Sequence, residues 1–279
     1  MSRILVVGGC GYIGSALVPF LKRAGHEVET CDIAGDPNVR MSYKEVTGWG
    51  LITQKYDTIV MLAGKSSVRS AEEDREEAFA ENLVDLVDFA MRLKPSQRFI
   101  YASSASVYAV YGEKFHNIYD YTKFAADAAL KLLRPGNTWG LRFGTVCGAS
   151  PNIRLDLMIN RMVWSALTRG YVEIANPEVQ RPILAMKDLL HGVADIIDDY
   201  IVSIPAGIHN LATANVRVGP IGMFVADRLG VKVKKLPATQ AYDFSMQLSG
   251  LFMPQESITS IVDDLIENHG EQWKKEAVK

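Results

Sequence analysis

The chain has 279 residues, of which 48% are hydrophobic and 22% charged, as in ordinary well-packed globular proteins. Its 30 Lys and Arg and 32 Asp and Glu give a net charge of −2, which argues against a broad basic surface for nucleic acid or an anionic membrane. Three cysteines without paired or ligand-like spacing, and no apolar run near the roughly 20 residues that cross a bilayer, predict a soluble cytoplasmic protein without a disulfide framework or metal site.

The first half of the chain alternates short apolar runs with longer amphipathic ones, a pattern that predicts an α/β fold with a doubly wound parallel sheet. Strands are predicted at residues 4–7, 27–31, 39–42, 58–62, 98–102 and 139–143. Helices are predicted at residues 12–23, 71–93 and 119–133. We interpret the acidic start of the second helix as a solvated first turn, because Ser70 and Glu73 have the spacing of a capping box.

After Gly148 the rhythm changes, and a proline-punctuated connection reaches Pro182. The later segments predict helices at residues 155–168, 187–200 and 220–229 and at the C-terminal end, with strands at 208–211 and 231–236. We therefore predict a larger domain over residues 1–150, completed by about 183–202, and a smaller α/β domain mainly within 151–279.

A glycine-rich segment at residues 8–14, with the sequence GGCGYIG, connects the first strand to the first helix. Glycines allow a tight turn and let a pyrophosphate approach the backbone, while the helix start donates N–H groups to it. We expect a dinucleotide to contact Gly8, Gly11, Tyr12, Ile13 and Gly14. The alternative is a plain glycine-rich turn, but the strand before it and the helix after it favour binding.

Asp32 lies eighteen residues beyond Gly14, at the end of the second predicted strand. A carboxylate at this place can accept hydrogen bonds from both hydroxyls of an adenosine ribose and would repel a 2′-phosphate. The cofactor is therefore predicted to be NAD rather than NADP. A turn-forming role before Gly35 is the alternative, and Asp36 is a weaker competitor for the ribose.

Tyr119 and Lys123 are four residues apart on a predicted helix and should share one face. A phenol has a pKa near 10, and a nearby ammonium stabilises its phenolate, so the pair could handle a proton. Tyr121 has no lysine four residues on. Ser104 and Ser106 follow a strand, where ligands gather in parallel sheets, and could meet a substrate oxygen. The alternatives are two surface residues of a helix and an ordinary polar loop.

These segments resemble the extended short-chain dehydrogenases/reductases, a family of NAD-dependent nucleotide-sugar epimerases and dehydratases of which UDP-galactose 4-epimerase is a familiar member. The resemblance covers nearly the whole chain. Its further motifs are LAG at residues 62–64, Asn82, SSASVY at 103–108, LRFGTVCG at 141–148, RPILAMKD at 181–188, HNL at 209–211 and LFMP at 251–254.

The resemblance implies roles for individual residues. Tyr119, Lys123 and Ser104 would be catalytic, and Lys123 would also hold the nicotinamide ribose. Ala63 and Gly64 would pass along the cofactor. The substrate contacts implied are Ser104, Ser106, Thr145, Asn160 and Arg181, the last of these on the phosphates of the nucleotide. The smaller domain would bind the substrate, and a homodimer would form through the Tyr119 helix and the helix before it.

Some departures from the family pattern narrow the reaction. Ala105 and Ser106 stand where related dehydratases have an Asp-Glu pair, so water elimination is not expected. The segment from Tyr108 to Tyr119, which would border the sugar, is short, and the substrate stays open. The leading hypothesis is epimerisation of a nucleotide sugar through transient oxidation to a keto intermediate and return of the hydride. The alternatives are a net oxidoreductase, such as a keto-sugar reductase or alcohol dehydrogenase, and a non-catalytic dinucleotide-binding regulator, which the presence of Tyr119 and Lys123 disfavours.

Overall fold

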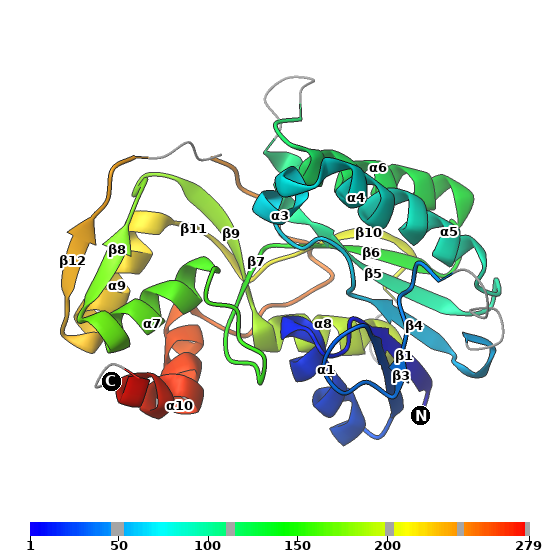
Figure 1. Cartoon of the computed structure of the whole chain (residues 1–279), viewed down its shortest axis with the longest axis horizontal. Helices are drawn as coiled ribbons and strands as arrows, with labels where there is room; N and C mark the ends of the chain where they lie inside the picture. Colours follow the sequence, from blue (N-terminus) through cyan, green and yellow to red (C-terminus); the bar gives the residue numbers. More distant parts are fainter. Residues whose placement is uncertain (46–52, 110–114, 199–203, 239–242, 277–279) are drawn as a thin grey trace. The chain divides into compact units, whose positions relative to one another are not determined.

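The protein is described from a computed structural model, which describes residues 1–45, 53–109, 115–198, 204–238 and 243–276 (Figure 1). The chain forms two compact units, and it passes between them three times. Unit 1 comprises residues 1–142 and 192–209, and unit 2 comprises residues 143–191 and 210–279.

Unit 1 is built on a seven-stranded sheet with the order β10-β6-β5-β4-β1-β2-β3. Its strands are β1 (Arg3–Val7), β2 (Glu27–Asp32), β3 (Val39–Arg40), β4 (Thr58–Met61), β5 (Arg98–Ser104), β6 (Thr138–Phe143) and β10 (Gly207–Leu211). β1 runs parallel to β2 and β4, and β4 runs parallel to β5. The order 3-2-1-4-5-6 is that of dinucleotide-binding folds, so the predicted doubly wound sheet and its six strands are confirmed within two residues at each end.

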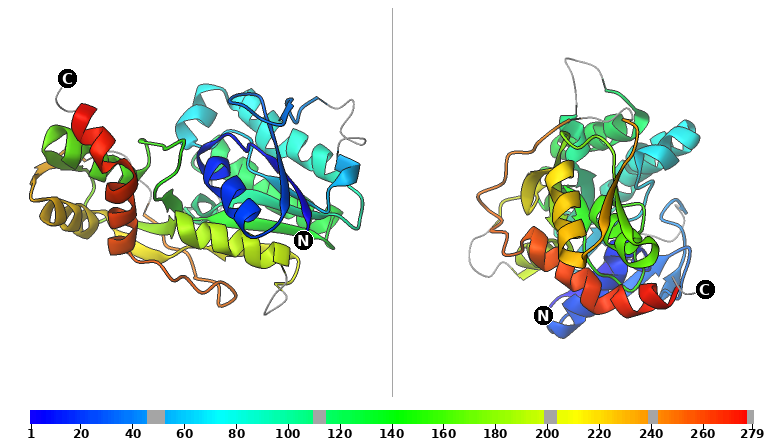
Figure 2. Two further views of the ribbon diagram at one scale, coloured as in Figure 1. Left: turned by 90° about the horizontal axis from the view of Figure 1, so that it is seen from below. Right: turned by 90° about the vertical axis from the view of Figure 1, so that its left-hand side faces the viewer.

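Helices cover both faces of this sheet. They are α1 (Tyr12–Arg23), α3 (Val68–Glu73), α4 (Arg75–Phe79), the π-helical turn η2 (Ala80–Asp85), α5 (Leu86–Met91) and α6 (Ile118–Leu133). Two short 3-10 turns, η1 (Thr53–Lys55) and η3 (Ala105–Tyr108), precede β4 and follow β5. Figures 1 and 2 show α3 to α6 on one face, with α1 and the C-terminal part of α8 (Met186–Asp198) on the other.

The predicted helix over residues 71–93 is wrong in its details. Asp74 has a non-helical backbone, which separates α3 from α4, and its carboxylate accepts the Glu77 N–H to begin α4. The predicted capping box at Ser70 is also wrong, because α3 begins earlier and Ser67 is its N-cap, accepting the N–H of Ser70. Serine and aspartate compete for backbone N–H groups, and here they start two helices where periodicity predicted one.

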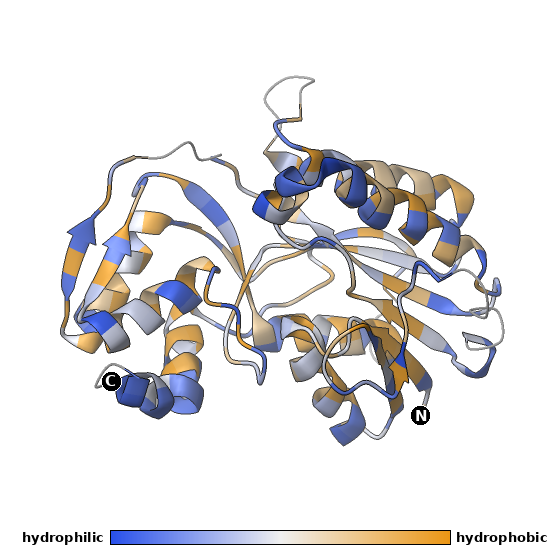
Figure 3. Cartoon of the chain, in the orientation of Figure 1, coloured by the Kyte–Doolittle hydropathy of each residue, from blue (hydrophilic) through white to orange (hydrophobic). Residues whose placement is uncertain are grey.

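The core of unit 1 lies between the sheet and the α3–α6 layer. Leu5, Ile59 and Phe99 come from three adjacent strands and are fully buried, and Ala126 and Leu130 of α6 pack into the same cluster. Figure 3 shows hydrophobic residues along these strands, while the helices mix hydrophobic and hydrophilic positions. Burial of both faces explains the continuous apolar runs of the strands.

Unit 2 contains two smaller sheets. β7 (Thr145–Cys147), β9 (Gln180–Ala185) and β11 (Ala214–Arg217) form one, and β8 (Tyr171–Ile174) with β12 (Lys232–Lys235) forms the other. The proline-punctuated connection thus contains β8 and β9, which were not predicted. β9 is the central strand of its sheet, but β7 pairs only with Ile183–Ala185, so at Pro182 β9 is paired on one side alone, with Asn215 of β11 opposite it.

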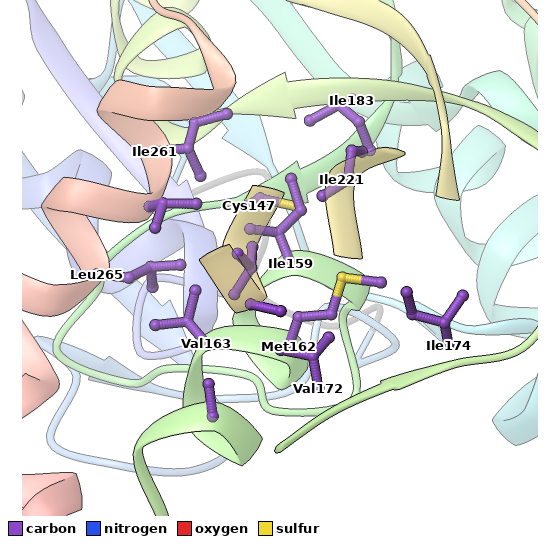
Figure 4. Close-up of a cluster of buried hydrophobic side chains, with 14 of the residues drawn as sticks. Cys147, Ile159, Met162, Val163, Val172, Ile174, Ile183, Ile221, Ile261 and Leu265 are labelled. Carbon is purple, nitrogen blue, oxygen red and sulfur yellow. The ribbon is translucent and has the colours of Figure 1, made fainter. Parts of the chain in front are cut away.

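Unit 2 also contains α7 (Met158–Arg169), α9 (Val218–Leu229), α10 (Ile258–Glu276) and the N-terminal part of α8. Figure 4 shows Ile159 and Val163 of α7 facing Ile221 of α9, Ile183 of β9 and Leu265 of α10 in one apolar cluster. The helices and strands that were predicted after Gly148 are confirmed within three residues at each end. Residues 199 and 200, the last two of the predicted helix over 187–200, lie outside the described residues. Within the described ranges, no helix is long and apolar enough to cross a membrane.

Candidate active site

The glycine-rich turn between β1 and α1 is shaped by close contacts. Gly8 has a φ of +83°, and a Cβ there would lie 2.8 Å from the backbone nitrogen of Ala63. A Cβ on Gly14 would lie 2.4 Å from the carbonyl oxygen of Gly8. Gly8 and Gly14 are therefore required by the backbone itself, before any ligand is considered. Tyr12 is buried at the start of α1, and Ile13 is half-buried.

The beginning of α1 fits the phosphates of a dinucleotide. Its N-cap is Gly11, which offers no side chain, and the first turn of α1 contains no acidic residue. Within the described chain, the first N–H groups of α1 therefore have no side-chain cap and carry the positive end of the helix dipole. This arrangement suits an anionic pyrophosphate.

Asp32 is joined directly to the glycine-rich turn. One carboxylate oxygen accepts the N–H of Cys10 at 2.9 Å, and the other accepts the N–H of Ala34 at 3.2 Å. Arg40 secures the same loop by donating to the carbonyl of Ile33 at 3.0 Å and to that of Gly35. Each carboxylate oxygen has a further lone pair, so Asp32 can shape the turn and still accept ribose hydroxyls. The two interpretations of Asp32 are thus compatible.

Ala63 and Gly64 follow β4 at the same end of the sheet. Gly64 has a φ of +129°, and a Cβ there would lie 2.7 Å from Oδ1 of Asn82. Asn82 is 1% exposed and donates from Nδ2 to the carbonyl of Lys65 at 3.1 Å, while its Oδ1 has no hydrogen-bond partner among the described residues. A buried polar atom without a partner is costly, and Asn82 lies in the π-helical turn η2. Asn82 is therefore a candidate site residue to which the sequence assigned no role.

Tyr119 and Lys123 lie together on the first turns of α6. The Lys123 Nζ is 5.8 Å from the centroid of the Tyr119 ring and donates to the Ala102 carbonyl at 2.9 Å. Asn117 is the N-cap of α6, and its Oδ1 accepts the N–H of Asp120 at 2.9 Å. The predicted helix and its four-residue spacing are confirmed, and they bring the two side chains to one face.

Burial changes the proton affinity of the lysine. Lys123 is 7% exposed, and desolvation lowers its pKa to about 8, while the nearby charge of Asp127 acts in the opposite direction. The Lys123 ammonium is therefore closer to neutrality at physiological pH than an exposed lysine. The charge of such a lysine can change when the neighbouring phenol of Tyr119 gains or loses a proton.

Two serine hydroxyls lie at the end of β5. The Oγ atoms of Ser104 and Ser106 are 2.8 Å apart, and Ser104 Oγ also accepts the N–H of Ser106 at 3.2 Å. Ser104 thereby caps the 3-10 turn η3. Both residues are partly exposed, so their hydroxyls are candidates for contact with a substrate oxygen.

The register of the sheet places these parts at one edge. Val7 of β1 lies opposite Met61 of β4, and Met61 lies opposite Tyr101 of β5. The glycine-rich turn, the Ala63–Gly64 segment and Ser104 follow these three residues within a few positions. They therefore emerge together at the carboxyl end of the sheet, where α/β folds bind ligands.

The remaining predicted residues lie in unit 2. Thr145 begins β7 and is partly exposed. Asn160 is fully buried; its Oδ1 accepts the N–H of Gly148 at 3.1 Å, and its Nδ2 donates to the Arg154 carbonyl at 3.0 Å. Arg181 donates to the Gln180 carbonyl at 2.7 Å, and its guanidinium lies 5.0 Å from the centroid of the Phe244 ring. Asn160 thus secures a loop of the chain, and the roles of Thr145, Asn160 and Arg181 toward a substrate stay predictions.

Residues 4–211 match the model of the NAD dependent epimerase/dehydratase family. The chain belongs to this family. It is accordingly an enzyme of a family that uses NAD, in agreement with the glycine-rich turn and with Asp32.

Individual relatives are more distant. A 3-beta-hydroxysteroid dehydrogenase of Mycolicibacterium neoaurum is 24% identical over 232 residues, which are 69% of this chain and 60% of that protein. The chain thus spans less than two thirds of the length of this curated relative. A solved UDP-glucose 4-epimerase of Thermus thermophilus, in complex with NAD, has a TM-score of 0.77 at 20% identity and covers 94% of this chain and 98% of its own.

A UDP-glucuronic acid 4-epimerase of Bacillus cereus, solved with UDP-glucuronic acid and NAD, has a TM-score of 0.78 at 19% identity and covers 98% of this chain and 99% of its own. At these identities the two structures show that the fold is shared.

Proposed function

We propose that this protein is an epimerase of a nucleotide sugar, acting through transient oxidation of one sugar carbon. The observation that carries the proposal is the Tyr119–Lys123 pair, with Nζ 5.8 Å from the centroid of the phenol ring and donating to the carbonyl of Ala102, two residues before Ser104 on β5. This edge of the sheet also holds the glycine-rich turn. Proton handling and cofactor binding thus meet in one unit of the protein.

Each residue has a separate task in the proposed reaction. Tyr119, as phenolate, takes the proton of the reacting sugar hydroxyl, and as phenol it returns a proton after the ketone has turned over. Lys123 stabilises the phenolate by its positive charge. Ser104 holds the reacting oxygen by hydrogen bonding and so fixes the distance over which the proton moves.

The cofactor would be held by the residues already described. The first turn of α1 would bind the pyrophosphate, Asp32 the adenosine ribose, and Lys123 the nicotinamide ribose. NAD supplies the hydride acceptor and donor when bound. Thr145, Asn160 and Arg181 are our candidates for the nucleotide-sugar contacts, and the UDP-glucuronic acid bound in the related Bacillus cereus structure supports this class of substrate.

A panel of UDP-, GDP-, dTDP- and CDP-sugars tests the proposal. We expect one class to raise the melting temperature and to be converted to an epimer, with no net change in the absorbance of reduced nicotinamide. Stabilisation by none of the sugar nucleotides would contradict the proposal. NAD binding without turnover of any substrate would instead support a regulator that has lost its chemistry.

A net oxidoreductase is the second candidate function. The observation that favours it is the similarity to a 3-beta-hydroxysteroid dehydrogenase, whose name denotes oxidation of a hydroxyl group. It requires the same Tyr119, Lys123 and Ser104 roles but releases the oxidised product. Stoichiometric formation of reduced nicotinamide with added NAD would establish it in place of the epimerase.

We also propose a homodimer that forms through α6 and the preceding helical layer. Tyr121, Phe124 and Leu132 lie on α6 and are 42%, 44% and 82% exposed, while Val84 and Met91 in the adjacent layer are each 50% exposed. Apolar side chains so exposed on neighbouring helices are typical of an interface. Light scattering should give the mass of two chains and, for Phe124→Glu, of one; a monomeric parent protein would contradict the proposal.

A cytoplasmic location also stays a proposal. Its support is that Cys10, Cys31 and Cys147 are not joined in disulfide bonds, as is usual in a reducing compartment.

A further inference from the structure

Asp127 joins α6 to the central sheet through several hydrogen bonds. Its Oδ1 accepts the hydroxyl of Tyr101 at 2.9 Å, and its Oδ2 accepts the hydroxyl of Ser103 at 3.0 Å. Both donors belong to β5, and the residue between them, Ala102, accepts Lys123 Nζ. Asp127 is 2% exposed and lies one helical turn after Lys123. The carboxylate and the ammonium are therefore held against the same short piece of strand.

Arg142 of β6 completes this cluster. Its Nε is 2.8 Å from Asp127 Oδ2, and both side chains are mostly buried, at 17% and 3% exposure. Its Nη1 donates to the hydroxyl of Tyr108 at 2.7 Å, and the guanidinium lies 5.1 Å from the centroid of that ring. Tyr108 ends the turn η3, which begins directly after Ser104. A single ion pair thus connects α6, β5, β6 and η3.

Charged and titratable groups of four elements are linked to Lys123, either directly or through Asp127 and Arg142. Tyr119 and Asp127 lie on α6 with Lys123, and Tyr101 of β5 contacts Asp127. Arg142 of β6 pairs with Asp127, and Tyr108 of η3 contacts Arg142. The negative charge of Asp127 raises the pKa of Lys123 and so favours the charged form of the lysine. Arg142 is positive and donates to Oδ2 of that same carboxylate.

We propose that the Asp127–Arg142 ion pair is a positioning device that sets the charge of Lys123 for the proton transfer at Tyr119. Asp127 retains the positive charge of the buried lysine, and Arg142 limits how strongly it does so. The inference rests on the proposed function, because a proton-handling Tyr119 is what gives the charge of Lys123 a use. Neither Asp127 nor Arg142 is assigned a contact with substrate.

The two members of the pair should act on Lys123 in opposite directions. Asp127→Asn removes the negative charge and leaves Arg142 positive, so the pKa of Lys123 should fall. Arg142→Gln keeps a hydrogen-bond donor but removes the opposing charge, so the pKa of Lys123 should rise. Unit charges a few ångströms apart in a protein interior shift a pKa by about one unit or more. A merely structural ion pair predicts a loss of stability from both substitutions, without shifts of opposite sign in the pKa of Lys123.

The test is an NMR titration of the lysine side-chain carbons in the full-length protein, with the Lys123 signal assigned through Lys123→Met. We expect a lower Lys123 pKa in Asp127→Asn and a higher one in Arg142→Gln. Arg142→Lys, which restores the charge, should return the value toward that of the parent protein. Shifts of the same sign, or no shift in either variant, would overturn the inference.

The titration is informative even if one variant does not fold. If Asp127→Asn is unfolded, the comparison of Arg142→Gln with Arg142→Lys decides, since only the first changes the charge. The measurement needs no substrate, so failure of every sugar nucleotide to react would contradict the proposed function without affecting this result. Where a substrate reacts, the pH dependence of kcat should move with the Lys123 pKa in each variant, while KM changes little.

Discussion

The carboxylate of Glu72 accepts a hydrogen bond of 2.8 Å from the backbone N–H of Ile118, the residue that precedes Tyr119. Ile118 is the first residue of α6, and its N–H has no partner within the helix. This bond, followed by the ion pair with Arg75, lowers the pKa of Glu72. Glu72 of α3 therefore fixes the start of the helix on which the proton-handling residues lie.

Glu72→Ala should lower the free energy of unfolding by about 1 kcal/mol, as is usual for a lost helix cap. It should also reduce kcat, because Tyr119 lies in the turn that loses its anchor, while NAD affinity changes little. Glu73→Ala is the matched control, since the Glu73 side chain is 63% exposed and pairs with Arg69 on the surface. Calorimetry and steady-state kinetics measure both effects; equal effects of the two substitutions would count against this role.

The same contact has a pH dependence with a defined sign. Because the pKa of Glu72 is lower in the folded protein than its ordinary value of 4.5, the stabilisation is present above that value. It is lost as the pH falls through the lower, folded-state pKa. Acid unfolding of Glu72→Ala should therefore lack part of the loss of stability below pH 4.5 that the parent protein shows.

Gly14→Ala tests the packing of the glycine-rich turn. The new methyl group would lie 2.4 Å from the Gly8 carbonyl oxygen and 2.6 Å from Gly9 Cα, so the turn must shift. We expect a loss of about 1–3 kcal/mol in stability and weaker NAD binding. Gly136→Ala adds a methyl group with nothing within 4 Å and should leave both unchanged. Unaltered NAD affinity in Gly14→Ala would show that this turn does not bind the pyrophosphate.

Asp32→Asn tests the choice between the two nicotinamide cofactors. The substitution keeps one acceptor oxygen but removes the charge that binds ribose hydroxyls and repels a 2′-phosphate. Hydrogen bonds to charged groups contribute about 1.5–3 kcal/mol, so NAD affinity should fall about tenfold or more, and the preference over NADP should shrink. Titration calorimetry with both cofactors measures this. If Asp36→Asn has the larger effect, the ribose-binding acid has been misassigned.

Lys123→Met should stabilise the cofactor-free protein while it removes turnover. The pKa of Lys123 is about 8 in the folded protein, against an ordinary value of 10.5, so folding disfavours its charged form. Between these two values the unfolded chain binds more protons, and the free energy of unfolding rises with pH. In Lys123→Met this rise should disappear, and stability at pH 7 should increase. Lower stability of the variant at pH 7 would contradict the assignment of a desolvated lysine.

The sequence predicted the parts of the fold that depend on periodicity and on glycine. The strands of unit 1 are continuous apolar runs. The glycine-rich turn is recognisable from the spacing of its glycines between a strand and a helix. It did not predict β7, β8 and β11, because each has only three or four residues, nor β9, because β9 contains Pro182, which normally argues against a strand. It also merged α3 and α4, since the break at Asp74 depends on one side chain and leaves the apolar spacing intact.

The candidate site was predicted in its chemistry more than in its supporting contacts. The spacing of Tyr119 and Lys123 fixes their common helix face. The roles of Glu72 and Asp127 depend on residues 46 and 15 positions away along the chain, at Ile118 and Arg142. No local pattern encodes such distant partners, so an acidic residue in a helix is naturally interpreted as solvated. Asn82 belongs to the motifs of the resemblance, but its buried Oδ1 beside Gly64, which has no hydrogen-bond partner among the described residues, is visible only in three dimensions.

The most direct test of the central claim is Tyr119→Phe, with NAD affinity and turnover measured on the same preparation. The substitution removes one hydroxyl and leaves the glycine-rich turn, Asp32 and Lys123 in place. Turnover should be abolished while NAD binds as it does to the parent protein. Turnover retained by Tyr119→Phe would show that the proton is handled by another group and would contradict the account.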